Sequence, residues 1–257
     1  MKNHRKNNLL SFIALIALLV GILILPGCTE SAVLEEIVEY TVDGTVHSLN
    51  IKVNAAELVI RDSEAFFVES NLKYLTVHEE NGILTITEET KLGSTYESPI
   101  LVLHMPTDTL FEQVHIQTGA GKLTAGELNT SILNMTLGAG DLSIANLRVT
   151  TDAKINGGAG KITVSDGSIK DLELEMGIGE LNLAATLIGN SDLSLGVGTS
   201  NIHLLGGREI YKIDIEKGLG QVTIDGIKVE DFGVTGTGNN SVDIEGGVGN
   251  IHIRFSA

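Results

Sequence analysis

The sequence predicts an all-β fold, a single-chain β-solenoid whose backbone coils around one core in rungs of about 20 residues. Two observations predict it: a regularly spaced Gly-x-Gly tripeptide, and alternating apolar and polar residues on both sides of each tripeptide. The first glycines are separated by 19, 20, 19, 19, 22, 18 and 11 residues. The tripeptides are Gly119-Ala120-Gly121, Gly138-Ala139-Gly140, Gly158-Ala159-Gly160, Gly177-Ile178-Gly179, Gly196-Val197-Gly198, Gly218-Leu219-Gly220, Gly236-Thr237-Gly238 and Gly247-Val248-Gly249.

The residues after each second glycine alternate between apolar and polar, as expected for a half-buried strand. Before the glycines the same alternation has the opposite phase. We therefore expect each tripeptide to form a corner between two strands, because glycine tolerates positive φ and close backbone approach. The apolar pairs after the corners are Leu123/Ala125, Leu142/Ile144, Ile162/Val164, Leu181/Leu183, Ile202/Leu204, Val222/Ile224, Val242/Ile244 and Ile251/Ile253.

The polar returns between rungs also carry apolar residues, which predicts a third inward-facing side. Rungs stacked about 4.8 Å apart would bury a continuous core. Other repeat folds fit less well, since the Leu-x-x-Leu-x-Leu pattern of leucine-rich repeats and any 3.6-residue period are absent. The residues assigned to the third side are Leu128, Ile132, Leu147, Ile169, Leu187, Ile227 and Val229.

In chain order, residues 1–27 read as a lipoprotein signal peptide. Lys2, Arg5 and Lys6 precede an apolar run from Leu9 to Leu25, and the segment ends in Leu-Pro-Gly-Cys28. These four residues resemble a bacterial lipoprotein cleavage box, apart from the proline, and this resemblance makes Cys28 the lipidated residue. The alternative is an uncleaved membrane anchor, because 17 apolar residues are near the lower limit for a spanning helix. Both place the domain outside the cytoplasmic membrane.

Residues 28–39 read as an acidic tether, and residues 40–257 as one β-solenoid domain. Cys28 is the only cysteine, so the exported domain depends on its hydrophobic core and has no internal disulfide. The chain carries a net charge of −16, which becomes 14 − 33 = −19 once the signal segment with its three basic residues is removed. This charge argues against nucleic-acid binding.

The first strands, from Tyr40 to Glu89, alternate in the same way but have no glycine corner. We interpret them as less regular first rungs, because a terminal rung must cover the open end of the core. A strand from Ile100 to Met105 ends at Pro106, the last proline of the chain. The absence of later prolines suits an uninterrupted ladder of hydrogen bonds.

A family resemblance rests on three segments: Leu84-Thr-Ile-Thr, Ile100-Leu-Val-Leu-His-Met-Pro106 and Val114-His-Ile-Gln-Thr-Gly119-Ala-Gly-Lys-Leu. Together they resemble a bacterial domain family of unknown function called the toast-rack or "putative adhesin" family, over roughly residues 40–257. The resemblance implies a β-helix-like stack and a place in the extracytoplasmic parts of envelope-stress sensing systems. It implies no catalytic residue.

Several patterns that could carry chemistry are better explained by structure. Nucleotide-binding glycine loops require a following helix, whereas strands follow here. A calcium ladder would need an aspartate in every rung, yet only Asp141 and Glu180 directly follow a corner. No metal site is expected from the scattered histidines. These are His47, His78, His104, His115, His203 and His252.

Two patterns leave alternative functions open. The return from Leu204 to Lys212, with Arg208, Glu209 and Tyr211, would be the loop of a polysaccharide-active β-helix enzyme. An outward column of polar residues could instead form a glycan-binding face. Its expected members are Thr124, Ser143, Thr163, Asn182, His203, Thr223 and Asp243.

The sequence therefore predicts a non-catalytic, lipid-anchored module of the bacterial cell envelope, without cofactor or metal. It would bind an envelope or extracellular protein or a glycan, or act as a scaffold, including in envelope-stress sensing. A surface adhesin for glycans or matrix is the first alternative, and a polysaccharide-active enzyme is the second.

Overall fold

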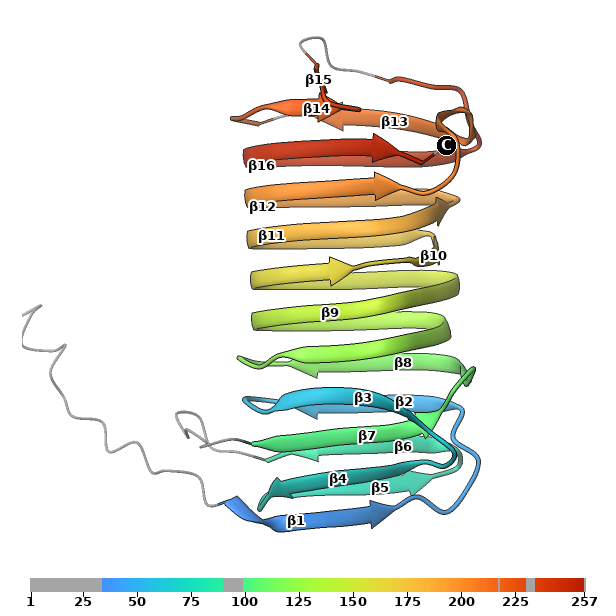
Figure 1. Cartoon of the computed structure of the whole chain (residues 1–257), viewed down its shortest axis with the longest axis vertical. Helices are drawn as coiled ribbons and strands as arrows, with labels where there is room; N and C mark the ends of the chain where they lie inside the picture. The colour runs from blue at the N-terminus through green and yellow to red at the C-terminus, as the bar shows by residue number, and fades with distance from the viewer. Residues whose placement is uncertain (1–33, 90–98, 217, 230–233, 257) are drawn as a thin grey trace, which may run out of the picture.

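The computed structural model describes residues 34–89, 99–216, 218–229 and 234–256, nearly all of them in strands (Figure 1). The strands are β1 (Leu34–Thr41), β2 (Ser48–Val53), β3 (Glu57–Ser63), β4 (Phe67–Leu72), β5 (Leu75–Glu80), β6 (Ile83–Glu88), β7 (Ile100–Pro106), β8 (Leu110–Thr118), β9 (Leu123–Val164), β10 (Gly167–Lys170), β11 (Leu172–Ile188), β12 (Asn190–Leu204), β13 (Tyr211–Glu216), β14 (Val222–Ile224), β15 (Ile227–Lys228) and β16 (Asn240–Phe255), and a 3₁₀ turn η1 spans Arg208–Ile210. The signal segment and Cys28 lie outside the described residues.

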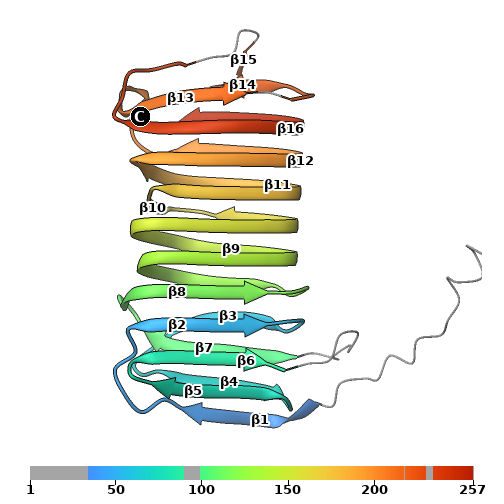
Figure 2. The same ribbon diagram turned by 180° about the vertical axis from the view of Figure 1, so that it is seen from behind.

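The middle of the molecule is a coil of parallel strands around one core, as predicted. Figures 1 and 2 show the rungs stacked along the long axis, with strands on the front and back of each rung. β11 pairs in parallel with β9 and with β12, and the register keeps inward residues such as Leu174 and Leu193 opposite one another. A single cluster of buried side chains runs from Val46 to Ile253.

The predicted third side is present for part of its assigned residues. Leu128, Leu147, Ile169 and Leu187 are fully buried, and β10 pairs in parallel with β9 and β11 on this side. Ile227 was assigned to it wrongly, because this residue lies in the short hairpin of β14 and β15 and is 73% exposed.

The glycine corners stack directly on one another. A Cβ added to Gly138 would overlap the carbonyl oxygen of Gly119, and one added to Gly158 would overlap that of Gly138. The second glycines show the same relation, since a Cβ on Gly179 would overlap the carbonyl oxygen of Gly160. The tight corner therefore leaves no room for a side chain at either glycine.

The rungs do not stack in sequence order at the C-terminal end. β16 pairs in parallel with β12 on one side and with both β13 and β14 on the other. The corner of Gly247 and Gly249 accordingly lies on that of Gly196 and Gly198, and the corner that begins at Gly218 is outermost. The last strand of the chain is thus inserted between two earlier rungs.

The tripeptide Gly236-Thr237-Gly238 is not one of the stacked corners. Gly236 lies against the backbone of Tyr211, and Gly238 lies against Ile210. Counting it as a rung was wrong, because the segment instead pairs with β13 through the bridge between Ile213 and Thr235. Consistent with this, Val234 lies two residues before Gly236, at an even offset, whereas the apolar residues before the stacked corners lie at odd offsets.

The N-terminal rungs are also rearranged, and one corner is made without glycine. The β2–β3 rung lies between the β6–β7 and β8–β9 rungs, and its corner is Asn54-Ala55-Ala56, against which Gly119 and Gly121 pack. The buried Glu88 side chain accepts hydrogen bonds from the backbone N–H groups of Asn54 (2.8 Å) and Ala55 (3.2 Å). At this corner a side-chain carboxylate thus accepts the hydrogen bonds that a backbone carbonyl of the preceding rung accepts at the other corners.

Strand β1 (Leu34–Thr41) already belongs to the sheet, so the predicted tether of residues 28–39 extends too far into the domain. β1 pairs antiparallel with β4, which in turn pairs antiparallel with β7. β1 shows no alternation, since its residues from Glu36 to Glu39 are all exposed, and it therefore did not look like a strand. Charged side chains on an edge strand are a common way to end a sheet without inviting further pairing.

Candidate functional site

The outward polar column differs from the predicted one at two positions. Asn182 is in register with Thr163 and Asn201, Asn201 with His252, and His252 with Thr223. His203 and Asp243 were assigned to this column wrongly. The buried Ser200 occupies the inward position held by Leu181 in the neighbouring rung, which displaced the apolar pattern on which the assignment relied.

The two misplaced residues lie elsewhere on the surface. His203 is two residues further along the same strand, in register with Ala184 and Arg254. Asp243 belongs to the strand before the corner, in register with Asp192 and Asp214.

This polar face contains a groove of ≈ 610 Å³ over the C-terminal rungs. Asn201 Nδ2 donates a hydrogen bond to Asn182 Oδ1 (2.9 Å), and His252 Nδ1 and Thr223 Oγ1 share one of 2.8 Å. The exposed Arg254 guanidinium adds a positive charge at the same face. Amide, hydroxyl, imidazole and guanidinium groups from neighbouring rungs are thereby held side by side on a rigid wall.

His203 lies at the edge of the groove, where its Nε2 shares a hydrogen bond of 2.7 Å with Ser256 Oγ. Burial lowers the pKa of the His203 imidazole below its ordinary value of 6.5, and the positive charge of Arg254 lowers it further. The neutral imidazole is therefore the form that the folded chain favours.

Acidification should destabilise the protein partly through His203. Because the His203 pKa is lower in the folded chain, the unfolded chain binds more protons just below pH 6.5, and stability falls as the pH drops through this window. In thermal melts between about pH 7 and about pH 5, His203→Gln should lose less stability than the wild type. Equal losses in both proteins would contradict this assignment.

The return suggested for an enzyme builds the C-terminal cover instead. Tyr211 is fully buried, and its hydroxyl donates a hydrogen bond of 2.6 Å to the Leu205 carbonyl. Arg208 donates to Thr235 Oγ1 (3.1 Å) and lies over the Phe255 ring, 5.5 Å from its centroid. Two of the three polar residues of this loop thus have structural contacts.

Several of the acidic residues and histidines that were considered as metal ligands have other partners in the structure. Glu180 Oε1 pairs with Lys161 Nζ (3.2 Å), and Asp141 Oδ1 accepts a hydrogen bond from the Lys161 backbone N–H (3.0 Å). His104 stacks on Phe67 and bonds Glu69 at 2.8 Å. Within the described ranges, no group of three or more His, Cys, Asp or Glu residues is placed to hold a metal ion.

The groove residues that sequence reasoning missed are Asn201, His252 and Arg254. The signal for the first two was present, since each is the third residue after a second glycine, as Asn182 is. No such signal existed for Arg254, because its place beside His203 depends on the insertion of β16.

No helix in the described part of the chain is long and apolar enough to cross a membrane.

Comparison with known proteins places the chain in a family. A family model described as Toastrack DUF4097 matches residues 46–203, more than half of the chain. No curated protein shows significant similarity to the sequence.

Solved structures are similar to this chain at low sequence identity, and one of them has a TM-score above 0.5. A "putative adhesin" from Bacteroides fragilis is 12% identical, with a TM-score of 0.52 over 84% of this chain and 95% of its own. A "putative cell adhesion protein" from Clostridium sporogenes is 16% identical, with a TM-score of 0.40 over 86% of this chain and 99% of its own. A "putative lipid binding protein" from Parabacteroides distasonis is 13% identical, with a TM-score of 0.39 over 84% and 96%. Because the family model covers residues 46–203, which include the five glycine corners from Gly119 to Gly198, the chain belongs to the toast-rack (DUF4097) family.

Proposed function

We propose that this protein is a non-catalytic binding module held outside the bacterial cell membrane by a lipid on Cys28. The observation that carries the proposal is the polar groove, in which Asn182, Asn201, Thr223 and His252 line up on successive rungs. Such an array offers preorganised hydrogen-bond partners to an extended polar ligand. The name of the Bacteroides fragilis neighbour, "putative adhesin", agrees with a binding role.

The proposed function has two versions, which differ in whether the binding partner is a protein or a glycan. An envelope protein as partner would make the module part of a scaffold or of envelope-stress sensing. A glycan as partner would make it an adhesin, and the amide and hydroxyl groups of the groove favour this second version. The described lining of the groove contains no Phe, Tyr or Trp side chain, so a sugar would be held mainly by hydrogen bonds.

Photo-crosslinking on living cells tests the proposal. A photoreactive residue at the exposed position 201, in the tethered protein, should capture a defined partner, and Arg254→Ala in the same protein should weaken the capture. The matched control is a photoreactive residue at Thr151, which is also exposed but lies outside the groove. Capture by both positions to the same extent would remove the groove as the binding site.

The captured material also decides between the versions. Loss of the product after glycosidase treatment identifies a glycan, and a cross-linked peptide from an envelope protein identifies the scaffold. Degradation of a polysaccharide by the purified protein, abolished by Glu209→Gln, would instead overturn the non-catalytic reading.

Lipid attachment makes a separate prediction. Cys28→Ser should abolish both metabolic labelling with a fatty-acid analogue and removal of the signal segment. In this type of export signal, lipid attachment to the thiol comes before the signal segment is cleaved. Labelling and gel mobility in bacterial membranes are the measurements. Labelling of the variant at the wild-type level would contradict a lipid on this cysteine.

A further inference from the structure

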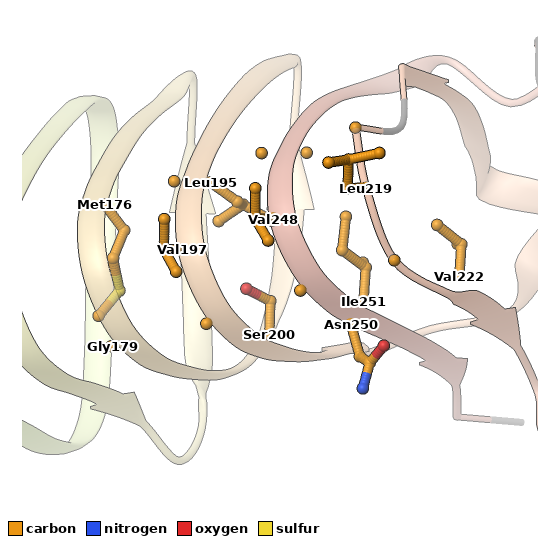
Figure 3. Close-up of a pocket in the computed structure, with 17 residues that line it drawn as sticks. Met176, Gly179, Leu195, Val197, Ser200, Leu219, Val222, Val248, Asn250 and Ile251 are labelled. Atoms are coloured by element: carbon orange, nitrogen blue, oxygen red, sulfur yellow. The ribbon is translucent and has the colours of Figure 1, made fainter.

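The middle residues of the C-terminal corners form an exposed apolar ridge. We define it as Ile178, Val197, Val248 and Leu219, which are 61%, 49%, 49% and 74% exposed. Val197 is in register with Ile178 and Val248, and Leu219 bridges to Val248, so the four side chains occupy adjacent rungs. Figure 3 shows Val197, Val248 and Leu219 in a row across three of these rungs.

The ridge residues are apolar although their side chains are exposed and do not contribute to the buried core. Ala55, Ala120, Ala139 and Ala159 continue the same position toward the N-terminal end, so each stacked corner within the described residues has an apolar middle residue. The tripeptide that is not stacked has Thr237 instead. Large apolar side chains are confined to four adjacent rungs, and an exposed apolar row of this kind commonly marks an interaction surface.

Space beneath the ridge is too small for a ligand. The gap among Met176, Leu195, Ser200 and Ile251 measures ≈ 20 Å³, about enough for one water molecule. A partner must therefore lie on the outside of the ridge, where the flanking glycines leave the backbone uncovered.

Carboxylates are concentrated on one side of the ridge. The column nearest to it, on the strands before the corner, contains Glu175, Ser194, Glu245 and Glu216 in register. The next column contains Glu173, Asp192, Asp243 and Asp214, also in register. Glu173 is the one member of these columns with an ion pair in the described ranges, to Lys154.

The other side of the ridge is nearly neutral over the same rungs. The residues that follow the corners there are Thr199, Asn250 and Gln221, and the charge of Glu180 is paired with Lys161. On the acidic side, a groove of ≈ 650 Å³ runs beside the ridge and is lined by corner glycines together with Glu175 and Glu245. Its carboxylates are within reach of anything that covers the ridge.

We propose that this surface docks a basic, amphipathic polypeptide segment of a partner protein. Its apolar side chains would cover the ridge, and its Lys or Arg side chains would reach the carboxylate columns, which otherwise repel one another at spacings of about 5 Å. A second copy of this chain is the poorer occupant, because two molecules of net charge −16 would have to bring their acidic faces together. The surface is separate from the polar groove and does not depend on what the groove binds.

A synthetic peptide tests the proposal directly. The probe is a helix-forming Leu/Lys peptide with one apolar face, about five turns long, and its scrambled isomer has the same composition without that face. Titration calorimetry with the chain from residue 29 onward, which lacks the proposed lipid site but contains every described strand, should show binding of the amphipathic peptide that weakens as salt is raised. The double variants Val197→Ser/Val248→Ser and Glu175→Gln/Glu245→Gln should each weaken it by about tenfold or more.

Controls separate docking from general attraction and from misfolding. Ala139→Ser changes the same position on an N-terminal rung, Asn201→Ala changes the polar groove, and both should leave peptide affinity unchanged. Thermal melts of the ridge variants should match the wild type, since the altered side chains are exposed.

The outcomes are distinct. Equal binding of the scrambled peptide, or no loss in the Val197→Ser/Val248→Ser variant, would overturn the proposal in favour of unspecific charge attraction. Absence of binding at low salt would also overturn it. A dimer in sedimentation that dissociates on Val248→Ser would replace the basic segment with a second copy. None of these results bears on crosslinking from position 201, which tests the groove independently.

Discussion

Replacing Gly179 by alanine should lower the free energy of unfolding by roughly 1–3 kcal/mol. Two causes act together at this position. Gly179 has φ +145°, a region that residues with a side chain rarely adopt, and an added Cβ would overlap the carbonyl oxygen of Gly160 in the rung below. The backbone of two rungs would have to separate, and the corner hydrogen bonds would lengthen with it.

Gly126→Ala is the matched control for this variant. Gly126 also lies in β9, but it has no positive φ, and an added Cβ would meet nothing within 4 Å. Its replacement should change stability by no more than about 0.5 kcal/mol, and in the favourable direction if the loss of chain freedom in the unfolded state dominates. Denaturant titration of both variants measures the difference. If the two alanine variants were equally stable, steric exclusion at the corner would not be the reason for glycine.

The sequence predicted the rung well because the rung is a local structure. The alternation around Gly177–Gly179 specifies two strands and a corner within about 15 residues, and period and parity report such short-range geometry directly. The buried third side followed from the same counting, since Leu147 and Leu187 recur at corresponding places in their rungs.

The order of the rungs could not be predicted in the same way. Every rung presents the same apolar residues inward and the same backbone groups along the stack, so β16 fits on β12 as well as β13 would have done. Pairing between segments as distant as Gly198 and Gly249 is a choice among similar surfaces, and a period in the sequence does not record it. The insertion of β2 and β3 between later rungs could not be predicted from the sequence for the same reason.

The candidate binding face was half predictable. Asn182 and Thr163 follow from the parity of their strands, whereas the approach of His203 to Arg254 depends on the inserted strand. A single polar residue at an inward position, Ser200, was enough to misplace one member of the column. Glu88 could not be predicted either. Its carboxylate accepts the hydrogen bond of the Asn54 N–H in place of a backbone carbonyl, and no sequence pattern indicates that this carbonyl is absent.

The inserted strand makes the second large prediction, that Ile244→Ala should cost about 2–5 kcal/mol. Ile244 is 1% exposed and lies in register between Leu193 of β12 and Ile215 of β13, so its loss leaves a cavity where the two neighbouring rungs meet. Ile227→Ala is the control, because Ile227 is 73% exposed and its truncation should cost less than about 0.5 kcal/mol.

Hydrogen exchange can locate the effect of Ile244→Ala. β13 and β14 both pair with β16, so their amides should lose protection together with those of β16, while amides of β9 should keep theirs. If the stack followed the sequence order, β13 would rest on β12, and weakening β16 would leave β13 protected. Retained protection of β13 alongside exchange in β16 would therefore show that the last strand does not hold the C-terminal rungs in place.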